Sequence, residues 1–371
     1  MTDWHESPDG PPDEAPGRSP DDAPWTAADD RDRPPSDGMG PAAPDGEPRE
    51  ASARPPHRPV FALAGRAAPG LYVAGWLLSA VGLGLILVAI LAARGTGPAG
   101  LVLFVAGTVA LTLGLVAASG AQAFQRRADG LAYPGPSPFL VFGADFALVN
   151  LVYAPIFLVG RQTGLLGAST PAGVLVSILV STLVYVALLR LLVVGTGGLS
   201  WRAMGVHRPD GATVRDLAMG VSTAVPVYLG TLILAVLLSS LLRTAPESPV
   251  PLTRDPIGLG LDLLAAAVLA PLGEELFFRG FATTAWLRAM GPSRAIVRGA
   301  LFFALVHVIN VSGTTFDEAL ARAVIAFVTR LPVALALGQL YVARRSLYAS
   351  FALHATFNAL GLVLGALAGS R

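Results

Sequence analysis

The chain has 371 residues, of which 53% are hydrophobic and 14% are charged, and its formal net charge is +1. Long apolar runs recur along most of its length, which is typical of an integral membrane protein. It has no cysteine, so disulfides, cysteine zinc sites and thiol catalysis are excluded. We expect the lipid bilayer to be its main surroundings, and we expect no nucleic-acid partner.

The start of the chain differs from the rest in charge and composition. Residues 1–50 hold 14 of the 25 acidic residues, whereas all 26 basic residues of the chain are arginines. Residues 1–59 are rich in Pro, Asp, Gly and Ala, so they bury too little apolar surface to offset the entropy of ordering. They predict a disordered, acidic, Pro-rich tail. Its acidity and its lack of an apolar core exclude a signal peptide.

The remaining residues predict an all-α fold, a polytopic membrane helix bundle with eight or nine transmembrane helices. A spanning helix needs about 20 apolar residues. The candidate spans are Leu71–Ala93, Ala99–Phe124, Pro138–Gly160, Pro171–Val194, Leu217–Leu242, Ile257–Leu287, Ala295–Val311, Arg322–Val342 and Leu347–Leu367. The span from Ala295 is short. The span from Arg322 contains Arg330 and Pro332, which predict a break, a tilt or a partly re-entrant course.

The placement of arginine predicts the orientation, because cytoplasmic loops carry an excess of basic residues. With the N-terminus inside, the inner segments are clearly more basic than the outer ones, and nine spans put the C-terminus outside. Arginine as the sole basic residue, with abundant Ala, Gly and Pro, indicates a GC-rich genome. We therefore expect a bacterial plasma membrane protein with a cytoplasmic N-terminus.

Ionisable residues within the apolar runs are few and costly. A charge at the centre of the bilayer costs at least about 2.5–3.5 kcal/mol on insertion scales. The acidic residues and histidines of the candidate spans are Asp145, Asp262, Glu274, Glu275, His307 and His354. A satisfied hydrogen bond between helices accounts for Asp145 and Asp262. It does not account for the other four together with Arg279 and Asn358, so these residues predict a functional site.

Helical spacing separates the two adjacent glutamates. Glu275 and Arg279 are four residues apart, on one face, so a buried ion pair fits them. Glu274 is rotated by about 100° from Glu275 and cannot share that contact. It has no partner on its own helix and is expected to face the bundle interior. His354 and Asn358, also four apart, share one face of the last span.

The depth of three side chains gives an independent check. At 1.5 Å of rise per residue, Glu274 lies about 21 Å along its helix from the inner end. His307 lies about 19 Å from the inner end of its span, and His354 about 13 Å, by the same rise. All three can therefore meet at one level within the membrane.

Three motifs, taken in order, resemble a known family. They are Glu274-Glu275-x-x-x-Arg279, Phe303-x-x-x-His307 and His354-x-x-x-Asn358. The set resembles that of the CAAX protease and bacteriocin-processing (CPBP) family of intramembrane endopeptidases, also called Abi or Rce1-like. The resemblance covers about residues 199–361. It leads us to divide the chain into the tail, N-terminal membrane helices over residues 60–198 and an Abi/CAAX-protease-like membrane domain over residues 199–371.

The resemblance implies a role for each motif residue. Glu274 would be the general base that, with His307, activates a water for attack on a peptide bond near the membrane. His354 and Asn358 would form the oxyanion site, and Glu275 with Arg279 the structural ion pair. The expected substrate is a peptide or a membrane protein. No cofactor is required in this mechanism.

Zinc is the alternative to direct activation of water. A glutamate and two histidines, here Glu274, His307 and His354, match a catalytic zinc ligand set, and the family has been described as metalloproteases. No span holds a His-x-x-x-His pair, however, and zinc would need a base other than Glu274. We favour direct activation by the glutamate.

Two other functions remain open at the level of the sequence. A transporter could use the same polar group as a proton or ion relay. Many transporters are built from internal repeats, whereas here the polar groups are concentrated in the C-terminal part. A non-catalytic scaffold or immunity protein would keep the fold, but it would have no need for the unpaired Glu274.

Overall fold

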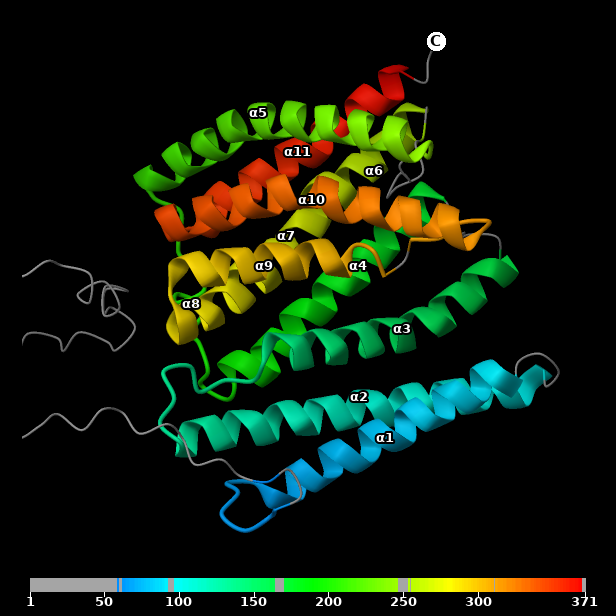
Figure 1. Cartoon of the computed structure of the whole chain (residues 1–371), viewed down its shortest axis with the longest axis vertical. Helices are drawn as coiled ribbons and strands as arrows, with labels where there is room; N and C mark the ends of the chain where they lie inside the picture. The colour runs from blue at the N-terminus through cyan, green and yellow to red at the C-terminus, as the bar shows by residue number, and fades with distance from the viewer. Residues whose placement is uncertain are drawn as a thin grey trace, which may run out of the picture. The chain divides into compact units, whose positions relative to one another are not determined.

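A computed structural model describes residues 59, 62–92, 97–163, 170–245, 253, 255–309 and 311–368. The predicted disordered tail, residues 1–59, lies outside these residues except for Pro59. Across the described residues the regular structure is helical and contains no strand. The predicted all-α fold is therefore confirmed, and Figure 1 shows the helices arranged side by side as a bundle.

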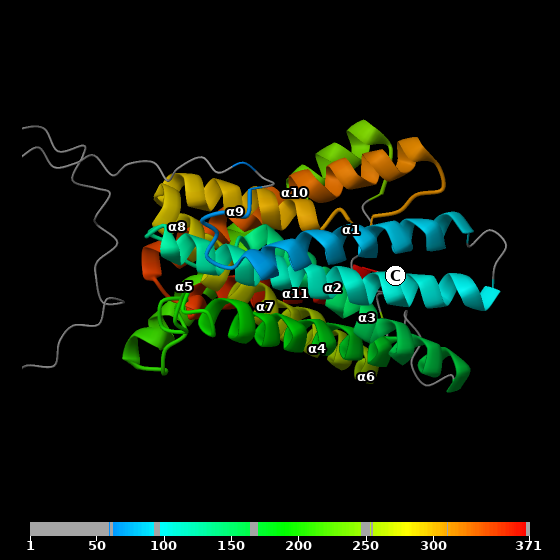
Figure 2. The ribbon, with the colours of Figure 1, turned by 90° about the horizontal axis from the view of Figure 1, so that it is seen from below.

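The first four helices follow one another across the bundle. They are α1 (Pro69–Ala92), α2 (Gly97–Ala128), α3 (Pro138–Thr163) and α4 (Pro171–Leu188), the last continued by a π-helical segment, η3 (Leu189–Val194). Helix α1 packs on α2, α2 on α3, and α3 on α4. Figures 1 and 2 both show α1 running along α2.

Close packing between α1 and α2 depends on glycine. A Cβ added at Gly75 would lie 2.9 Å from Ala118, and one at Gly107 would lie 2.9 Å from the Gly82 carbonyl oxygen. A Cβ on Gly82 would in turn collide with the backbone at Gly107 and Leu111. Small residues let helix backbones approach in a bilayer, where lipid supplies no hydrophobic drive for association.

The second half of the fold is organised around one long, distorted helix. Residues Pro256–Met290 run as α6 (Pro256–Leu263), η4 (Leu264–Leu269), α7 (Ala270–Glu274), η5 (Glu275–Thr283) and α8 (Thr284–Met290), with η4 and η5 in π-helical form. Helix α4 packs along its first part, and α9, α10 and α11 pack against η5.

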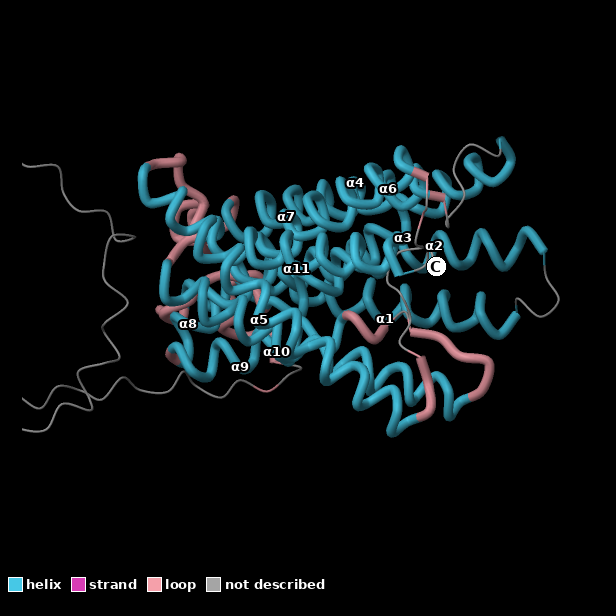
Figure 3. Tube along the Cα trace, turned by 90° about the horizontal axis from the view of Figure 1, so that it is seen from above, coloured by secondary structure: helices cyan, strands magenta, loops and turns pink. Residues whose placement is uncertain are grey.

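The other helices of this half are α5 (Gly211–Leu242), α9 (Pro292–Val306), α10 (Phe316–Arg344) and α11 (Leu347–Ala368). The break expected in the span from Arg322 is absent, because α10 is a single 29-residue helix with Pro332 inside it. Packing of α10 against α5, α9 and α11 outweighs the backbone hydrogen bond that the proline removes. In Figure 3 the loops lie mainly at the ends of the helices.

Among the described residues, eight helices are long and apolar enough to cross a membrane. This agrees with the lower of the two predicted numbers of spans. The short span expected from Ala295 is α9, which has 15 residues and ends at Val306. In Figure 1 it ends partway along α10, and a loop continues toward the end where α10 begins.

Candidate active site

The two glutamates lie where the long helix changes its winding. Helix α7, only five residues long, separates the π-helical segments η4 and η5 and ends at Glu274. Thr283 Oγ1 donates a hydrogen bond of 2.8 Å to the Phe278 carbonyl, five residues earlier. Thr284 Oγ1 approaches the Arg279 carbonyl at 3.4 Å in the same way. These hydroxyls support the widened turns, and π-helical segments inside α-helices often mark functional sites.

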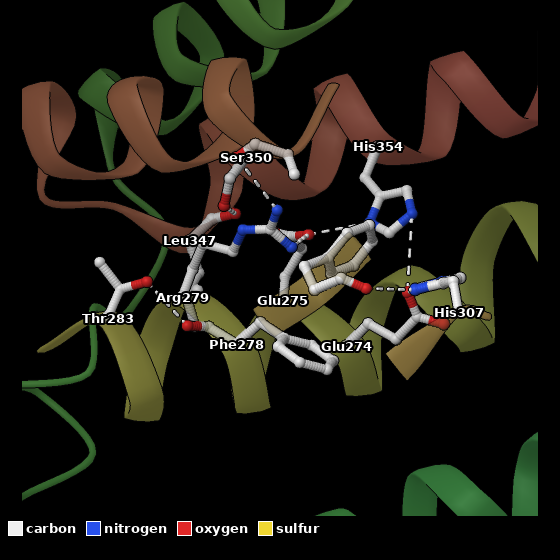
Figure 4. A network of polar contacts seen from close by, with 11 residues as sticks. Glu274, Glu275, Phe278, Arg279, Thr283, His307, Leu347, Ser350 and His354 are labelled. Atoms are coloured by element: carbon white, nitrogen blue, oxygen red, sulfur yellow. Dashed lines mark hydrogen bonds and ion pairs between the residues drawn. The ribbon is translucent and has the colours of Figure 1, made fainter. Parts of the chain in front are cut away.

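Glu274 faces two histidines from other helices. Its Oε2 lies 3.7 Å from His307 Nε2 and 3.8 Å from His354 Nε2, as Figure 4 shows. The side chain is 22% exposed, but Oε2 itself is buried and has no hydrogen-bond partner. The prediction that these three side chains can meet is confirmed.

In both histidines the Nδ1 proton is used in a hydrogen bond. His307 Nδ1 lies 2.7 Å from the Phe303 carbonyl oxygen, and His354 Nδ1 lies 2.8 Å from Glu275 Oε1. A carbonyl or an ionised carboxylate can only accept, so each Nδ1 carries the proton. In a neutral imidazole the other nitrogen is then an acceptor. Both Nε2 atoms therefore direct lone pairs toward Glu274.

The early end of α9 fixes the ring of His307. This residue is the C-cap of α9, and its backbone N–H bonds to the Leu305 carbonyl instead of continuing the helix. The Phe303 carbonyl is one of the last of the helix, a group that needs an outside donor. The ring of His307 supplies that donor. The half-length of α9 thus determines which way the imidazole points.

Glu275 and Arg279 form the ion pair predicted from their spacing. Arg279 Nη1 lies 2.8 Å from Glu275 Oε1, and both side chains are 2% exposed. The guanidinium also lies 4.4 Å from the centroid of the Phe303 ring, and its Nη2 reaches the Ala334 carbonyl at 3.4 Å. Phe303 in turn contacts the His307 ring at a centroid distance of 4.3 Å. The pair is therefore packed directly behind the histidines.

The structure adds a contact of Glu275 that the sequence did not reveal. The oxygen that binds Arg279 also accepts the Nδ1 proton of His354, 79 positions away. A contact between helices so far apart leaves no trace in local spacing. Glu275 therefore orients a site residue in addition to neutralising Arg279.

Asn358 makes a different contact. Its Nδ2 donates a 2.8 Å hydrogen bond to the Ala266 carbonyl in η4. Asn358 thus ties α11 to a π-helical part of the long helix. The oxyanion role expected of Asn358 stays a prediction.

A cavity of about 550 Å³ adjoins Glu274 and His307. Its wall includes side chains from α3, α4 and α10 that sequence reasoning left out of the site, among them Asp145, Tyr185 and Arg330. The expectation that Asp145 and Asp262 are satisfied by hydrogen bonds is wrong. Asp145 Oδ1 and both carboxylate oxygens of Asp262 are buried without a partner. A charge inside an apolar run was the only available signal for Asp145.

The same geometry bears on the zinc alternative. Ligand atoms about 2.0–2.1 Å from a tetrahedral zinc lie about 3.3 Å apart. Here the two Nε2 atoms are 3.7 and 3.8 Å from Glu274 Oε2. Within the described ranges no group of three or more His, Cys, Asp or Glu residues is arranged to hold a metal ion. As placed, these atoms are spread wider than a tetrahedral zinc requires, and direct activation of water by Glu274 stays a prediction.

Comparison of the chain with known proteins identifies one protein family to which part of it is similar. Residues 256–360 match the family model Rce1-like, described as Type II CAAX prenyl endopeptidase Rce1-like. The match includes all three motifs and lies within the predicted domain at residues 199–371, whose boundaries stay a prediction. Neither the curated proteins nor the solved structures give a significant match. Residues 256–360 are therefore similar to the Rce1-like family, in agreement with the CPBP family that the three motifs resemble.

Proposed function

We propose that the protein is an intramembrane endopeptidase that uses Glu274 and His307 to activate a water molecule. One observation carries the proposal. A buried carboxylate oxygen with no partner faces two imidazole nitrogens at 3.7 and 3.8 Å. The match of this segment to an endopeptidase family model supports it.

The spacing of the three acceptor atoms suits one water molecule. Atoms 3.7–3.8 Å apart are too distant for a direct hydrogen bond. A water oxygen can, however, lie about 2.8 Å from both atoms of each pair. The water has two protons, so it can donate one to Glu274 Oε2 and the other to His307 Nε2. A lone pair of its oxygen is then available to attack a carbonyl carbon.

The proposed reaction needs only this water and the side chains. The water oxygen bonds to the carbonyl carbon of the peptide as Glu274 takes one of its protons. The C–N bond then breaks, and Glu274 returns that proton to the leaving amine, so that a carboxylic acid and an amine result. General-base catalysis of this kind contributes about 10²–10⁴-fold to a rate.

The oxyanion role implied for His354 sets a condition on its protonation. Its Nδ1 proton is used on Glu275, so only a doubly protonated ring has a second N–H to donate from Nε2. The Glu275 carboxylate stabilises that cation by contact. We propose that His354, with Asn358 as the second donor, stabilises the developing oxyanion in this form.

The substrate class is inferred from the family model and from the composition of the chain. The matched family model carries the name of CAAX prenyl endopeptidases. The composition points to a bacterial plasma membrane, which favours peptides or membrane proteins without a prenyl group. We propose such substrates, cleaved by a protein whose N-terminus is cytoplasmic, as the arginine distribution predicts.

The test is Glu274→Gln in the full chain, purified and reconstituted in liposomes with a membrane protein extract. New peptide termini are counted by mass spectrometry. We expect cleavage to fall by about 10²–10⁴-fold, the contribution of a general base, with no loss of insertion or thermal stability. Glu318→Gln is the matched control, because Glu318 is a partly exposed glutamate that pairs with Arg322 on α10 and does not line the cavity.

Other outcomes would replace the proposal. Undiminished cleavage by Glu274→Gln removes Glu274 as the base. Flux of protons or ions that depends on Glu274, without cleavage of any protein, identifies a transporter. A phenotype that survives in Glu274→Gln identifies a scaffold. Cleavage that a chelator abolishes and zinc restores replaces direct activation with metal chemistry.

A further inference from the structure

The cavity beside Glu274 extends well beyond the residues that activate water. Besides Glu274 and His307, it is lined by residues of α3 and α4, which lie outside the segment matched by the family model. Its volume of about 550 Å³ lies in the range of ligand pockets. Residues in this wall lie beside any chain whose peptide bond reaches Glu274.

Asp145, on α3, is the most unusual group in this wall. Asp145 is only 4% exposed, and its Oδ1 is buried without a hydrogen-bond partner. No ion pair reaches it within the described part of the chain. A buried polar group left without a partner is costly, so such a group calls for an explanation. A ligand in the cavity would provide its partner.

Aromatic side chains line the same cavity as this carboxylate. Phe142 and Phe146 lie on the same helix and line the cavity, where their rings are stacked at a centroid distance of 6.4 Å. Tyr153 and Tyr185 contribute two further rings to the wall. Aromatic faces attract cations and cover the apolar stems of long basic side chains. A carboxylate with aromatic walls is the chemistry that recognises an ammonium or guanidinium group.

Arg330, on α10, does not already supply that cation. It lines the same cavity, but its Nη1 donates to the Ala326 carbonyl of its own helix at 3.0 Å. Its charge interacts with that of Glu274, which lines the same cavity. The cavity thus has a positive group associated with Glu274 and a separate acidic group at Asp145.

We propose that Asp145 is a substrate-binding residue that accepts a lysine or arginine side chain of the peptide near the bond to be cleaved. The proposal rests on the proposed endopeptidase function and adds a preference for basic substrates. The carboxylate would form a charge-assisted hydrogen bond with the guest, and the rings would pack on its stem.

Binding can be measured apart from cleavage. The full chain with Glu274→Gln is placed in lipid nanodiscs and titrated with fluorescein-labelled Ala-based decapeptides that carry one arginine at successive positions. The reference peptides carry citrulline, a neutral isostere, at the same positions. At one position we expect arginine to bind at least about 10-fold more tightly than citrulline, the factor of one charge-assisted hydrogen bond.

Variants identify the residue responsible. Adding Asp145→Asn should reduce the preference to less than about 2-fold, because the amide keeps the shape and loses the charge. Asp145→Glu should retain most of it. Asp262→Asn is the matched control, a second buried acid that does not line the cavity, and should leave the preference unchanged.

The outcomes separate this proposal from the proposed function. Equal binding of arginine and citrulline peptides at every position, or a preference that persists in Asp145→Asn, overturns the role of Asp145. Cleavage of both peptides by the wild-type protein at equal rates would support the protease function and contradict the role of Asp145. Binding that depends on Asp145, with no cleavage by the wild-type protein, would support the role of Asp145 and contradict the protease function.

Discussion

Helices α1 and α2 and the group formed by η5, α9, α10 and α11 are two packed regions of one membrane bundle. The first is held by backbone contact at glycines, and α1 carries no charged side chain. The second buries a glutamate, an arginine and a histidine behind Glu274. Shape alone can hold helices together in lipid. The second region bears the cost of buried charge, and in the proposed function that charge positions the residues that activate water.

The largest effect should come from breaking the buried pair. Arg279→Met leaves Glu275 buried beside His354 without its counter-ion, and we expect a loss of about 3–5 kcal/mol in the free energy of unfolding. The measurement is unfolding in mixed detergent micelles, followed by circular dichroism.

A double variant separates the effect of this ion pair on stability from its effect on cleavage. Glu275→Met with Arg279→Met should recover much of the lost stability, because no unpaired charge remains. It should not recover cleavage, because His354 loses the acceptor of its Nδ1 proton. If the double variant were as unstable as Arg279→Met, the pair would not be the source of the loss.

An intermediate effect is expected from filling the glycine contact of the first region. Gly82→Val places a side chain against the backbone of α2 at Gly107 and Leu111, and we expect about 1–3 kcal/mol of destabilisation by overpacking. Cleavage per folded molecule should stay unchanged. Gly84→Val, on the same helix but with open space at its Cβ, is the matched control. Equal effects of the two variants would show that helix propensity, not contact, is responsible.

The smallest effect should come from a neutral polar contact in the second region. Tyr341 Oη and Thr284 Oγ1 are 2.7 Å apart and fully buried between α10 and α8. Tyr341→Phe should cost about 1 kcal/mol, the usual net value of one hydrogen bond. Tyr228→Phe, whose ring packs on Phe357, should cost less. A loss at Tyr341 as large as that at Arg279 would mean that charge is not what distinguishes this region.

The sequence predicted the helices and the central group well, for a physical reason. Apolar length identifies a spanning helix, and a fixed rise per residue converts position into depth. These two rules were enough to bring Glu274, His307 and His354 to one level. The ion pair of Glu275 and Arg279 followed from helical spacing alone.

Most of the features that were missed depend on contacts between distant segments. The hydrogen bonds from His354 to Glu275 and from Asn358 to Ala266 join positions 79 and 92 residues apart. The π-helical winding on both sides of α7 has no periodic signature in the sequence. Asp145 was interpreted from its own span, whereas its neighbours in the cavity come from α4, α9 and α10.

The half-length of α9 has a consequence for the supply of solvent. Each peptide bond that is hydrolysed consumes one water molecule, which lipid cannot provide. Beyond Val306 the wall of the cavity is formed by His307, Ile309 and Val311, which belong to a connecting segment and not to a helix. A complete ninth span would have closed this side of Glu274 with helix. By stopping early, α9 leaves this side of the cavity to a loop, and the proposed hydrolysis would draw its water from there.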